Sequence, residues 1–372
     1  MVRNTARRKL YWVTALPTPY QDFFFQTLAD DSQVEFIVYF EKLLSRDHPW
    51  RTDLAKCYNA QFYRRAFGLD WHVLRVALKE KNSFFVIAGW VDLTTILLTN
   101  ILCLTGRRFA LWSDTPNLGR ERNPVFALFR KQWLKWVFRR ATKIFATGRP
   151  GAETFYRMGA PTAKLADFPF FVDLEAYRPE VRDSSFDPTR TIRFISSGRI
   201  QNNLKGHDIA LQALASASRK SSLGFEYIIA GTGPDEPALR ALARRLGVAD
   251  RVHLAGWVEP VRLQDLYRSS HVLIHPSPVH DPFPNAVLEG MASGLVILGS
   301  DVSGSVQDRV RHGMNGFIHR AGDVTDLSEH IEFLLRNPLR IAEMALRARA
   351  TAEEWPIERG ISILKAVLNE TH

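Results

Sequence analysis

Cysteine is scarce in this chain, and its scarcity excludes several classes of protein. Only Cys57 and Cys103 occur among 372 residues. Two cysteines cannot form a disulfide framework or a four-thiolate zinc site, so we expect a protein of a reducing compartment. The histidines match no zinc spacing, and no Asp-x-Asp stands at an expected strand end. We therefore expect neither a metal ion nor another cofactor.

Long uninterrupted apolar runs are lacking as well. Near the N-terminus, the run Leu10–Leu16 is short and Pro17 and Pro19 follow it, which favours a buried first strand over a secretion signal. The stretch Phe84–Leu104 reaches membrane-spanning length, but polar residues interrupt it and Gly89-Trp90 divides it into a strand and a helix. The sequence therefore predicts a soluble, cytoplasmic protein.

Acidic residues are too few to balance the basic ones: 49 Lys and Arg against 39 Asp and Glu give a net charge of +10. That sign favours an anionic partner, and nucleic acid, an acidic membrane surface and a phosphorylated substrate all satisfy it. No nucleic-acid-binding motif is present. A phosphate loop ending in Gly-Lys-Ser or Gly-Lys-Thr and the full six-position dinucleotide pattern are also missing. Neither a nucleoside triphosphatase nor an NAD enzyme is expected.

What the chain does have is an alternation of short apolar runs with segments of helical periodicity. This alternation predicts right-handed βαβ units and an α/β fold with doubly wound parallel sheets. The expected strands begin near Leu10, Val34, Phe84, Phe109, Ile144, Ile192, Phe225, Val252, Val272, Leu295 and Phe317. Polar, proline-bearing sequence from Tyr177 to Arg190 is typical of a linker. We expect Rossmann-like domains over 1–180 and 181–350, facing a cleft, and a C-terminal helix over 351–372 that can cross back to the first domain.

The most informative segment is His275–Ser300, where two acids break an apolar background. A strand is expected to end at its first residue, and a helix to begin near Asn285. Asp281 lies in the loop, and Glu289 follows eight residues later in the helix. A helix N-terminus favours a phosphate, and a carboxylate one turn further in can accept hydrogen bonds from a ribose diol. Taken alone, a loop cap and a solvated glutamate explain the two acids equally well.

Two glycine-containing turns follow other expected strands. Gly198 and Arg199 end one strand, and Lys205 precedes the next helix. Cations at such a turn suit a diphosphate, although two solvated surface cations would give the same pattern. Gly231 and Gly233 follow the next strand, where glycine allows the backbone to approach a ligand closely.

The order of these three pieces resembles the retaining glycosyltransferases of family four, which have the two-domain GT-B fold. The motif of two acids separated by seven residues appears here as Asp281 and Glu289, and the resemblance is strong over about residues 190–340. It implies that Arg199 and Lys205 neutralise the diphosphate of a nucleotide sugar, and that Glu289 binds its ribose. It also implies that Asp281 faces the transferred sugar, so these four residues form the expected catalytic set. The implied donor-binding set further contains Gly198, Gly231, Gly233, Phe283, Pro284, Asn285, Ala286, Val287, Gly304 and Ser305.

The sequence departs from the family pattern at three places. Asp281 stands where glutamate is usual, which shortens the reach by one methylene. Pro284 stands where glycine is frequent, and it offers no N–H to the sugar. In the first domain, many relatives carry a histidine after the strand that here ends in Ser113 and Asp114. Together with Tyr20, these two residues are the candidates for orienting the sugar or the acceptor.

A basic and aromatic segment is the candidate partner surface of the first domain. Residues 123–143 place Phe126, Phe129, Trp133 and Trp136 at helical spacing, with arginines and lysines between them. For most of this helix, the expected explanation is a core-facing side opposite a solvated basic side. The alternative is docking at an anionic membrane surface, which would suit a lipid-linked acceptor. The equally basic and aromatic region 43–81 could line the acceptor side too.

We therefore expect a retaining, metal-independent glycosyltransferase that moves a hexosyl or related sugar from a nucleotide-diphosphate sugar. The expected acceptor is a glycan or lipid-linked glycan of cell-envelope polysaccharide synthesis, met in the cytoplasm or at the inner face of the membrane. Glycoside hydrolysis is not expected, because it needs carboxyl groups on opposite sides of one bond. Two alternatives remain: a sugar-nucleotide epimerase of the same fold, and a catalytically silent protein that binds sugar nucleotide or glycan.

Overall fold

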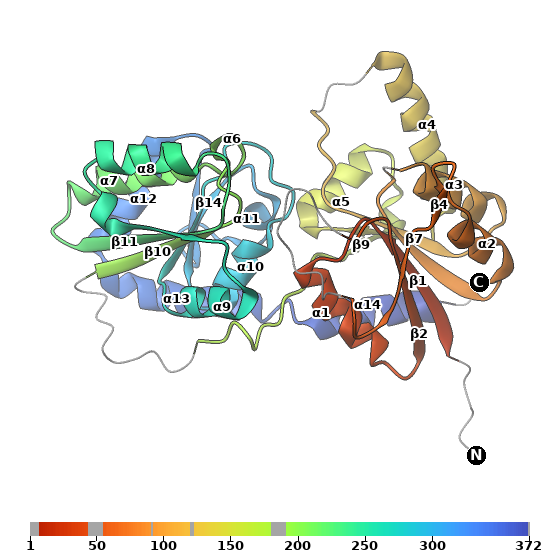
Figure 1. Cartoon of the computed structure of the whole chain (residues 1–372). Coiled ribbons are helices and arrows are strands. Elements are labelled where there is room, and N and C mark those ends of the chain that lie inside the picture. Colours follow the sequence, from red (N-terminus) through yellow and green to blue (C-terminus); the bar gives the residue numbers. More distant parts are fainter. Residues whose placement is uncertain (1–6, 44–54, 91, 120–122, 180–190, 371–372) are drawn as a thin grey trace. The chain divides into compact units, whose positions relative to one another are not determined.

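The computed structural model describes residues 7–43, 55–90, 92–119, 123–179 and 191–370, and it divides the chain into two compact units. Unit 1 contains Met1–Phe171 and Ile357–His372, and unit 2 contains Val172–Pro356. Each unit is built on its own parallel sheet with helices around it (Figure 1). The predicted boundary at 180 and 181, with most of the predicted linker, lies outside the described residues.

Unit 1 has a seven-stranded sheet in the order β3-β2-β1-β6-β7-β8-β9, in which all neighbouring strands are parallel. Its strands are β1 (Arg8–Thr14), β2 (Val34–Phe40), β3 (Asn59–Phe62), β6 (Ser83–Ala88), β7 (Phe109–Ser113), β8 (Lys143–Ala146) and β9 (Leu165–Asp167). An antiparallel pair, β4 (Arg65–Ala66) and β5 (Leu69–Asp70), lies outside this sheet. The helices are α1 (Pro19–Ala29), α2 (Trp71–Lys79), α3 (Leu93–Leu104), α4 (Pro124–Arg140), α5 (Gly148–Arg157), the short η1 (Thr162–Lys164) and α14 (Ile357–Asn369).

The sheet of unit 1 is buried on both faces, because successive side chains of a strand point to opposite sides. On β1, Leu10 and Trp12 join one apolar cluster, whereas Tyr11 and Val13 join the other. Helix α14 belongs to the first of these clusters, since Leu364 packs there. The C-terminal segment is therefore part of the core of unit 1.

The apolar stretch Phe84–Leu104 forms strand β6 and helix α3, as the polar interruptions predict. Gly89 adopts a φ of +88°, which glycine reaches without strain, and the chain turns there. Asp92 caps α3, because its Oδ1 accepts hydrogen bonds from the backbone N–H groups of Thr94 and Thr95. Among the described residues, no helix is long and apolar enough to cross a membrane.

Unit 2 has a six-stranded parallel sheet in the order β12-β11-β10-β13-β14-β15. Its strands are β10 (Thr191–Ser197), β11 (Gly224–Ala230), β12 (Val252–Gly256), β13 (Val272–His275), β14 (Val296–Ser300) and β15 (Gly316–His319). Its helices are α6 (Asn202–Lys205), α7 (His207–Ser218), α8 (Glu236–Arg245), η2 (Ala249–Arg251), α9 (Pro260–Arg268), α10 (Asn285–Ala292), α11 (Gly304–Arg309), α12 (Val324–Arg336) and α13 (Pro338–Ala352). Each apolar run that was predicted as a strand in either half is a strand.

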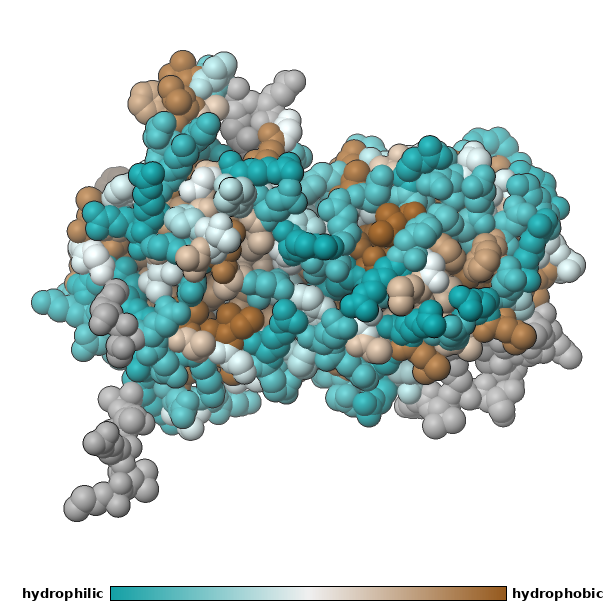
Figure 2. All heavy atoms as spheres, turned by 180° about the vertical axis from the view of Figure 1, so that it is seen from behind, coloured by the Kyte–Doolittle hydropathy of each residue, from teal (hydrophilic) through white to brown (hydrophobic). Residues whose placement is uncertain are grey.

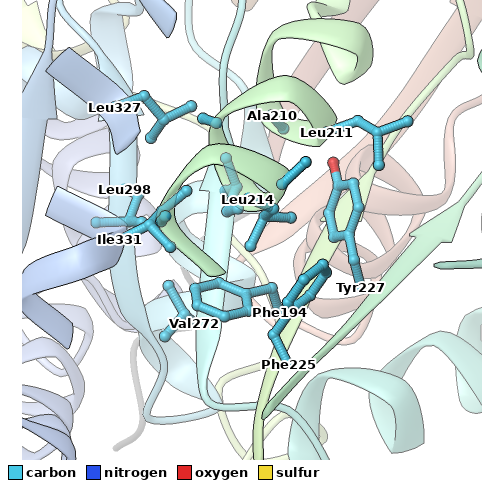
Figure 3. Close-up of a cluster of buried hydrophobic side chains, with 14 of the residues drawn as sticks. Phe194, Ala210, Leu211, Leu214, Phe225, Tyr227, Val272, Leu298, Leu327 and Ile331 are labelled. Atoms are coloured by element: carbon cyan, nitrogen blue, oxygen red, sulfur yellow. The ribbon is translucent and has the colours of Figure 1, made fainter. Parts of the chain in front are cut away.

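The core of unit 2 lies on both faces of its sheet. On one face, Leu214 of α7 and Ile331 of α12 pack over Phe194 and Phe225 of the strands (Figure 3). On the other face, helices α9, α10 and α13 cover the sheet with a second buried cluster that includes Val287. These buried layers fix the strand ends, and the loops that follow the strands carry the polar residues of the candidate site.

Candidate functional site

The candidate site lies at the point where the strand order of unit 2 reverses. Strands β10 and β13 are neighbours at the middle of the sheet, although the chain reaches β13 only after building β11 and β12. In sheets of this kind, ligands bind in the crevice outside the carboxyl ends of the strands at such a switch point. Here those ends are Ser197 and His275. Lys205 is the last residue of the short helix α6 that follows the first end, and Asp281 lies in the loop after the second.

The structure brings Lys205 and Asp281 together across this switch point. The Lys205 Nζ lies 2.5 Å from Asp281 Oδ2, and both side chains are largely shielded from solvent. Gly206 makes this approach feasible: it has a φ of +66°, and a Cβ there would meet the carbonyl oxygen of Pro276 at 2.2 Å. The two loops therefore pack backbone against backbone, and glycine is required where they touch.

Two further side chains hold Asp281 in place. His275 Nε2 lies 3.0 Å from Asp281 Oδ2, and the Ser277 hydroxyl donates to the same oxygen at 3.0 Å. Burial raises the pKa of Asp281, but the hydrogen bond from His275 and the charges of His275 and Lys205 outweigh it and hold that pKa well below its usual range. The carboxylate is thus ionised at neutral pH. Among the described residues, the side-chain hydrogen bonds of Asp281 all reach Oδ2 and none reaches Oδ1.

Glu289 lies in a different environment, between two tyrosines. The Tyr267 hydroxyl donates to Glu289 Oε2 at 3.1 Å, and the Tyr177 hydroxyl also hydrogen-bonds this carboxylate. Tyr267 is linked in turn to Ser197 at the end of β10, at 2.5 Å. Burial raises the pKa of Glu289 to about 7, more than the tyrosines lower it. Glu289 is therefore not the solvated surface glutamate of the simpler interpretation.

The N-terminus of α10 has backbone N–H groups that could bind an anion. Pro284 is its N-cap residue, and no side chain caps the helix. The backbone N–H groups of the first turn, at Ala286 and Val287, have no partner within a helix and point outward from its end. Asn285 Oδ1 is buried without a hydrogen-bond partner among the described residues.

Phe283 and Val287, both predicted to bind donor, turn their side chains into the protein. Val287 is fully buried. The Phe283 ring lies against the Arg309 guanidinium, 4.7 Å from ring centroid to Cζ, and the Trp355 ring also contacts that cation, at 4.8 Å. Only main-chain atoms of these two positions are placed to meet a ligand.

The predicted glycine positions have a structural explanation of their own. A Cβ at Gly231 would meet the carbonyl oxygen of Gly198 at 1.9 Å, and one at Gly233 would meet the carbonyl oxygen of Ile200 at 2.1 Å. The turns after β10 and β11 therefore pack together through their backbones. Arg199 follows Gly198 in this turn, and it is half-buried.

Gly304 and Ser305 contact the main chain of the loop that contains Asp281. The Gly304 N–H donates to the carbonyl oxygen of Asp281 at 3.0 Å, and a Cβ at Gly304 would meet the carbonyl oxygen of Pro282 at 1.9 Å. The Ser305 hydroxyl donates to the carbonyl oxygen of Pro284 at 3.0 Å. Both residues are buried, so they support the loop.

The candidate acceptor residues of unit 1 come together at the carboxyl end of its own sheet. Tyr20 lies in the first turn of α1, Ser113 is the last residue of β7, and Asp114 follows it. Burial raises the pKa of Tyr20 to about 12, and the charge of Asp114 adds to that effect. Asp114 is exposed, and the Ser113 hydroxyl donates to its carbonyl oxygen. In the described part of the chain, no group of three or more His, Cys, Asp or Glu side chains is arranged to hold a metal ion.

Sequence reasoning assigned no role to four residues that the structure places in the site. His275 and Ser277 hold Asp281, and Tyr177 and Tyr267 hold Glu289. The first two flank a proline at a strand end within the motif, which is a usable signal. Nothing in the local pattern of the tyrosines distinguishes them from core residues.

Comparison with known proteins finds relatives for the part of the chain that contains this site. Residues 178–355 match the family described as glycosyl transferases group 1. A D-inositol 3-phosphate glycosyltransferase of Rhodococcus erythropolis (strain PR4 / NBRC 100887) is 34% identical over 198 residues, which cover 50% of this chain and 44% of the relative. One from Gordonia bronchialis is 31% identical over 56% of this chain and 48% of the relative. The chain thus spans about half the length of these curated relatives.

Solved structures resemble the chain over nearly its whole length. HepE of Anabaena, solved in complex with UDP, has a TM-score of 0.75 at 15% identity and covers 96% of this chain and 99% of its own. The lipopolysaccharide outer core galactosyltransferase WaaB has a TM-score of 0.71 at 17% identity and covers 97% and 99%. At such low identity the likeness establishes the fold. The chain therefore has the two-domain GT-B fold with Rossmann-like domains, and its residues 178–355 are similar to the glycosyl transferases group 1.

Proposed function

We propose that this protein is a glycosyltransferase that takes its sugar from a nucleotide-diphosphate sugar bound at the switch point of unit 2. The observation that carries the proposal is the arrangement around Lys205 and Asp281. A cation and an ionised carboxylate lie side by side there, on loops that pack together at the carboxyl ends of β10 and β13. A nucleotide sugar offers a diphosphate for the cation and sugar hydroxyls for the carboxylate.

The diphosphate would be neutralised by Lys205, Arg199 and the first turn of α10. An ammonium group has three N–H donors, so Lys205 can keep its bond to Asp281 and still donate to a phosphate oxygen. The uncapped N–H groups of α10 add the positive end of a helix dipole. Charge that develops on a departing diphosphate is stabilised by donors of this kind when they are fixed in place beforehand. In this proposal the protein alone supplies the stabilisation, without a metal ion or another cofactor.

Asp281 would orient the transferred sugar. Its Oδ2 is held by three donors, and its low pKa keeps it ionised, so it is suited to accepting hydrogen bonds from sugar hydroxyls through Oδ1. A carboxylate that is fixed and ionised makes a poor proton donor. The family resemblance implies transfer with retention of configuration, and we propose that a diphosphate oxygen helps to take the acceptor proton.

Glu289 would bind the ribose of the nucleotide. It lies about one turn into α10, with Tyr177 and Tyr267 donating to it, so its position is fixed before a ligand arrives. A ribose diol donates hydrogen bonds and so favours the ionised form of the carboxyl group. Donor binding should therefore lower the raised pKa of Glu289.

The acceptor in this proposal is a glycan or lipid-linked glycan of cell-envelope polysaccharide synthesis, and the transferred group is a hexosyl or related sugar. The name of WaaB, a galactosyltransferase of the lipopolysaccharide outer core, supports this choice, whereas the two curated relatives described above are named for D-inositol 3-phosphate. Tyr20, Ser113 and Asp114 are the proposed acceptor-side residues of unit 1. The protein would work in the cytoplasm, at the inner face of the membrane where its acceptor is lipid-linked.

Thermal unfolding with a panel of UDP-, GDP-, ADP- and dTDP-sugars, and with the free diphosphates, tests the donor site. A ligand that binds only the folded state raises the unfolding temperature by mass action. We expect one nucleotide to stabilise the protein, and Lys205→Ala to abolish that shift. Transfer is then followed by release of nucleoside diphosphate on adding candidate acceptors. Conversion of the donor sugar without an acceptor would show an epimerase, and binding without turnover would show a silent binding protein.

A further inference from the structure

Helix α4 of unit 1 packs against the core in its second half, where Trp133 and Trp136 also contact the core cluster. In its second half, Leu134, Val137 and Phe138 are buried against the unit. The first half extends away from the sheet (Figure 1). Four large apolar side chains are exposed there: Val125 at 64%, Phe126 at 63%, Leu128 at 59% and Phe129 at 72%. The expected core-facing explanation is therefore correct for the second half of the helix and wrong for Phe126 and Phe129.

The exposed apolar residues form one continuous stripe. At about 100° per residue, the four fall within an arc of about 160°, and Trp133 and Trp136 fall within the same arc further along the helix. These two tryptophans are half-buried. The buried residues of α4 lie on the opposite side, about 150° from the middle of the stripe. We name Val125, Phe126, Leu128 and Phe129 the α4 tip.

Packing against the described residues of the unit does not account for the α4 tip. Its side chains belong to none of the buried clusters of unit 1, so their apolar area contributes little to the stability of the fold. Single exposed apolar residues are ordinary, but adjacent ones on a projecting element are typical of an interaction surface. Figure 2 shows this hydrophobic surface at the projecting end of α4, at the upper left.

The charge around the stripe indicates what covers it. Helix α4 carries five basic residues and no acidic one. Arg130 and Lys131 follow the α4 tip directly, and on a helical projection they flank the stripe on its two edges. Apolar side chains bordered by cations are the pattern of a helix that lies in the interface of an anionic bilayer.

We infer that the α4 tip inserts into the surface of an anionic lipid bilayer, with Lys131 meeting the lipid phosphates and Arg130, which lies over the Trp90 ring, adding positive charge at the other edge. The inference deepens the proposed function, because it rests on that proposal for the reason to dock: a lipid-linked acceptor lies in such a surface. The docking surface itself stands on unit 1 alone, whereas the donor site stands on unit 2. Failure of one can therefore be distinguished from failure of the other.

Co-sedimentation with lipid vesicles tests the inference. The full chain should bind vesicles of phosphatidylcholine mixed with phosphatidylglycerol, and not vesicles of phosphatidylcholine alone. Binding should weaken as salt is added, because the cations act through a screened potential. The double variant Phe126→Ser/Phe129→Ser should lose about tenfold or more in affinity, since each buried phenylalanine contributes more than one factor of ten when fully inserted. Lys131→Gln should lose about fivefold on the anionic vesicles only.

A matched control removes apolar side chains from another exposed helix. Leu339 and Leu346 of α13 are 78% and 75% exposed, so Leu339→Ser/Leu346→Ser removes a similar apolar area. This control should bind vesicles as the wild type does, and both double variants should keep the thermal shift given by the donor nucleotide. Equal vesicle binding by the Phe126/Phe129 variant and the wild type would overturn the inference. So would an α4-dependent dimer in solution that does not bind vesicles, because the stripe would then be covered by a second copy.

Discussion

Lys205 Nζ and Asp281 Oδ2 lie 2.5 Å apart, although the two residues are 76 positions apart in the chain and belong to separate sequence motifs. The family resemblance assigns one to the diphosphate and the other to the sugar. Their contact makes the two assignments interdependent, because each charge stabilises the other in a site where solvent is largely excluded. A substitution at either residue should therefore affect the binding of both the diphosphate and the sugar of the donor.

Lys205→Ala should lower the turnover number about 100- to 1000-fold, the usual cost of removing one fixed donor from a developing negative charge. Donor affinity should fall as well, because Asp281 then stands near the diphosphate without its neutralising partner. The matched control is Lys220→Ala, which breaks an exposed ion pair with Glu332 and should leave turnover unchanged. Steady-state release of nucleoside diphosphate measures both. Near-normal turnover in the Lys205 variant would remove this lysine from the donor site.

His275→Phe should shift the acid limb of the pH–activity profile to higher pH. The histidine donates to Asp281 Oδ2 and helps to hold the pKa of that carboxyl down. Without it, the pKa of Asp281 rises towards its ordinary value, so protonation begins at a higher pH as the solution is acidified. Ser277→Ala, which removes the hydroxyl donor to the same oxygen, should move the limb in the same direction by a smaller amount. An unchanged acid limb with reduced stability would show that His275 serves only the fold.

Glu289→Gln should remove a pH dependence of stability. The pKa of Glu289 is about 7 in the folded protein, and we take the ordinary glutamate value of 4.5 for the unfolded chain. Between these values the folded state holds a proton that the unfolded state has lost, so the wild type loses stability as pH rises from 4.5 to 7. With partial exposure taken into account, the loss amounts to about 1–3 kcal/mol.

Chemical denaturation of wild type and Glu289→Gln at several pH values measures this difference. The variant should show a flatter profile over that window, and Glu358→Gln, at an exposed glutamate, should keep the wild-type profile. The same substitution bears on the ribose assignment. Calorimetry should show weaker donor binding by Glu289→Gln, and for the wild type near pH 7 it should show proton release, because the ribose favours the carboxylate.

The strands and the motif loops could be predicted from the sequence because their signals are local. The buried runs that form β1 and β10 and the start of α10 near Asn285 follow from apolar periodicity and from proline and glycine positions. Strands β3 and β9 were missed. β3 is largely exposed and β9 is half-buried and short, so neither has an apolar run. The β4–β5 pair is too short to give a pattern at all.

Contacts between distant parts of the chain could not be predicted from local sequence patterns. The clamp of Tyr177 and Tyr267 on Glu289 joins a segment before β10 to helices α9 and α10, and no local spacing records it. At the α4 tip, the sequence predicted a contact with the core that the structure does not have. Helical spacing correctly placed Phe126 and Phe129 on one face, but spacing alone does not say which face meets the core.

Gly231→Ala should destabilise unit 2 by about 3 kcal/mol or more, because the new methyl group would overlap the carbonyl oxygen of Gly198 and force two turns apart. Gly247→Ala is the matched control: it has a positive φ of +71° but no atom within 4 Å of an added Cβ. Its cost should be the backbone strain alone, about 1–2 kcal/mol. Urea denaturation gives both values. If Gly231→Ala were no less stable than the control but no longer bound donor nucleotide, glycine would be needed there for the ligand rather than for the packing of the turns.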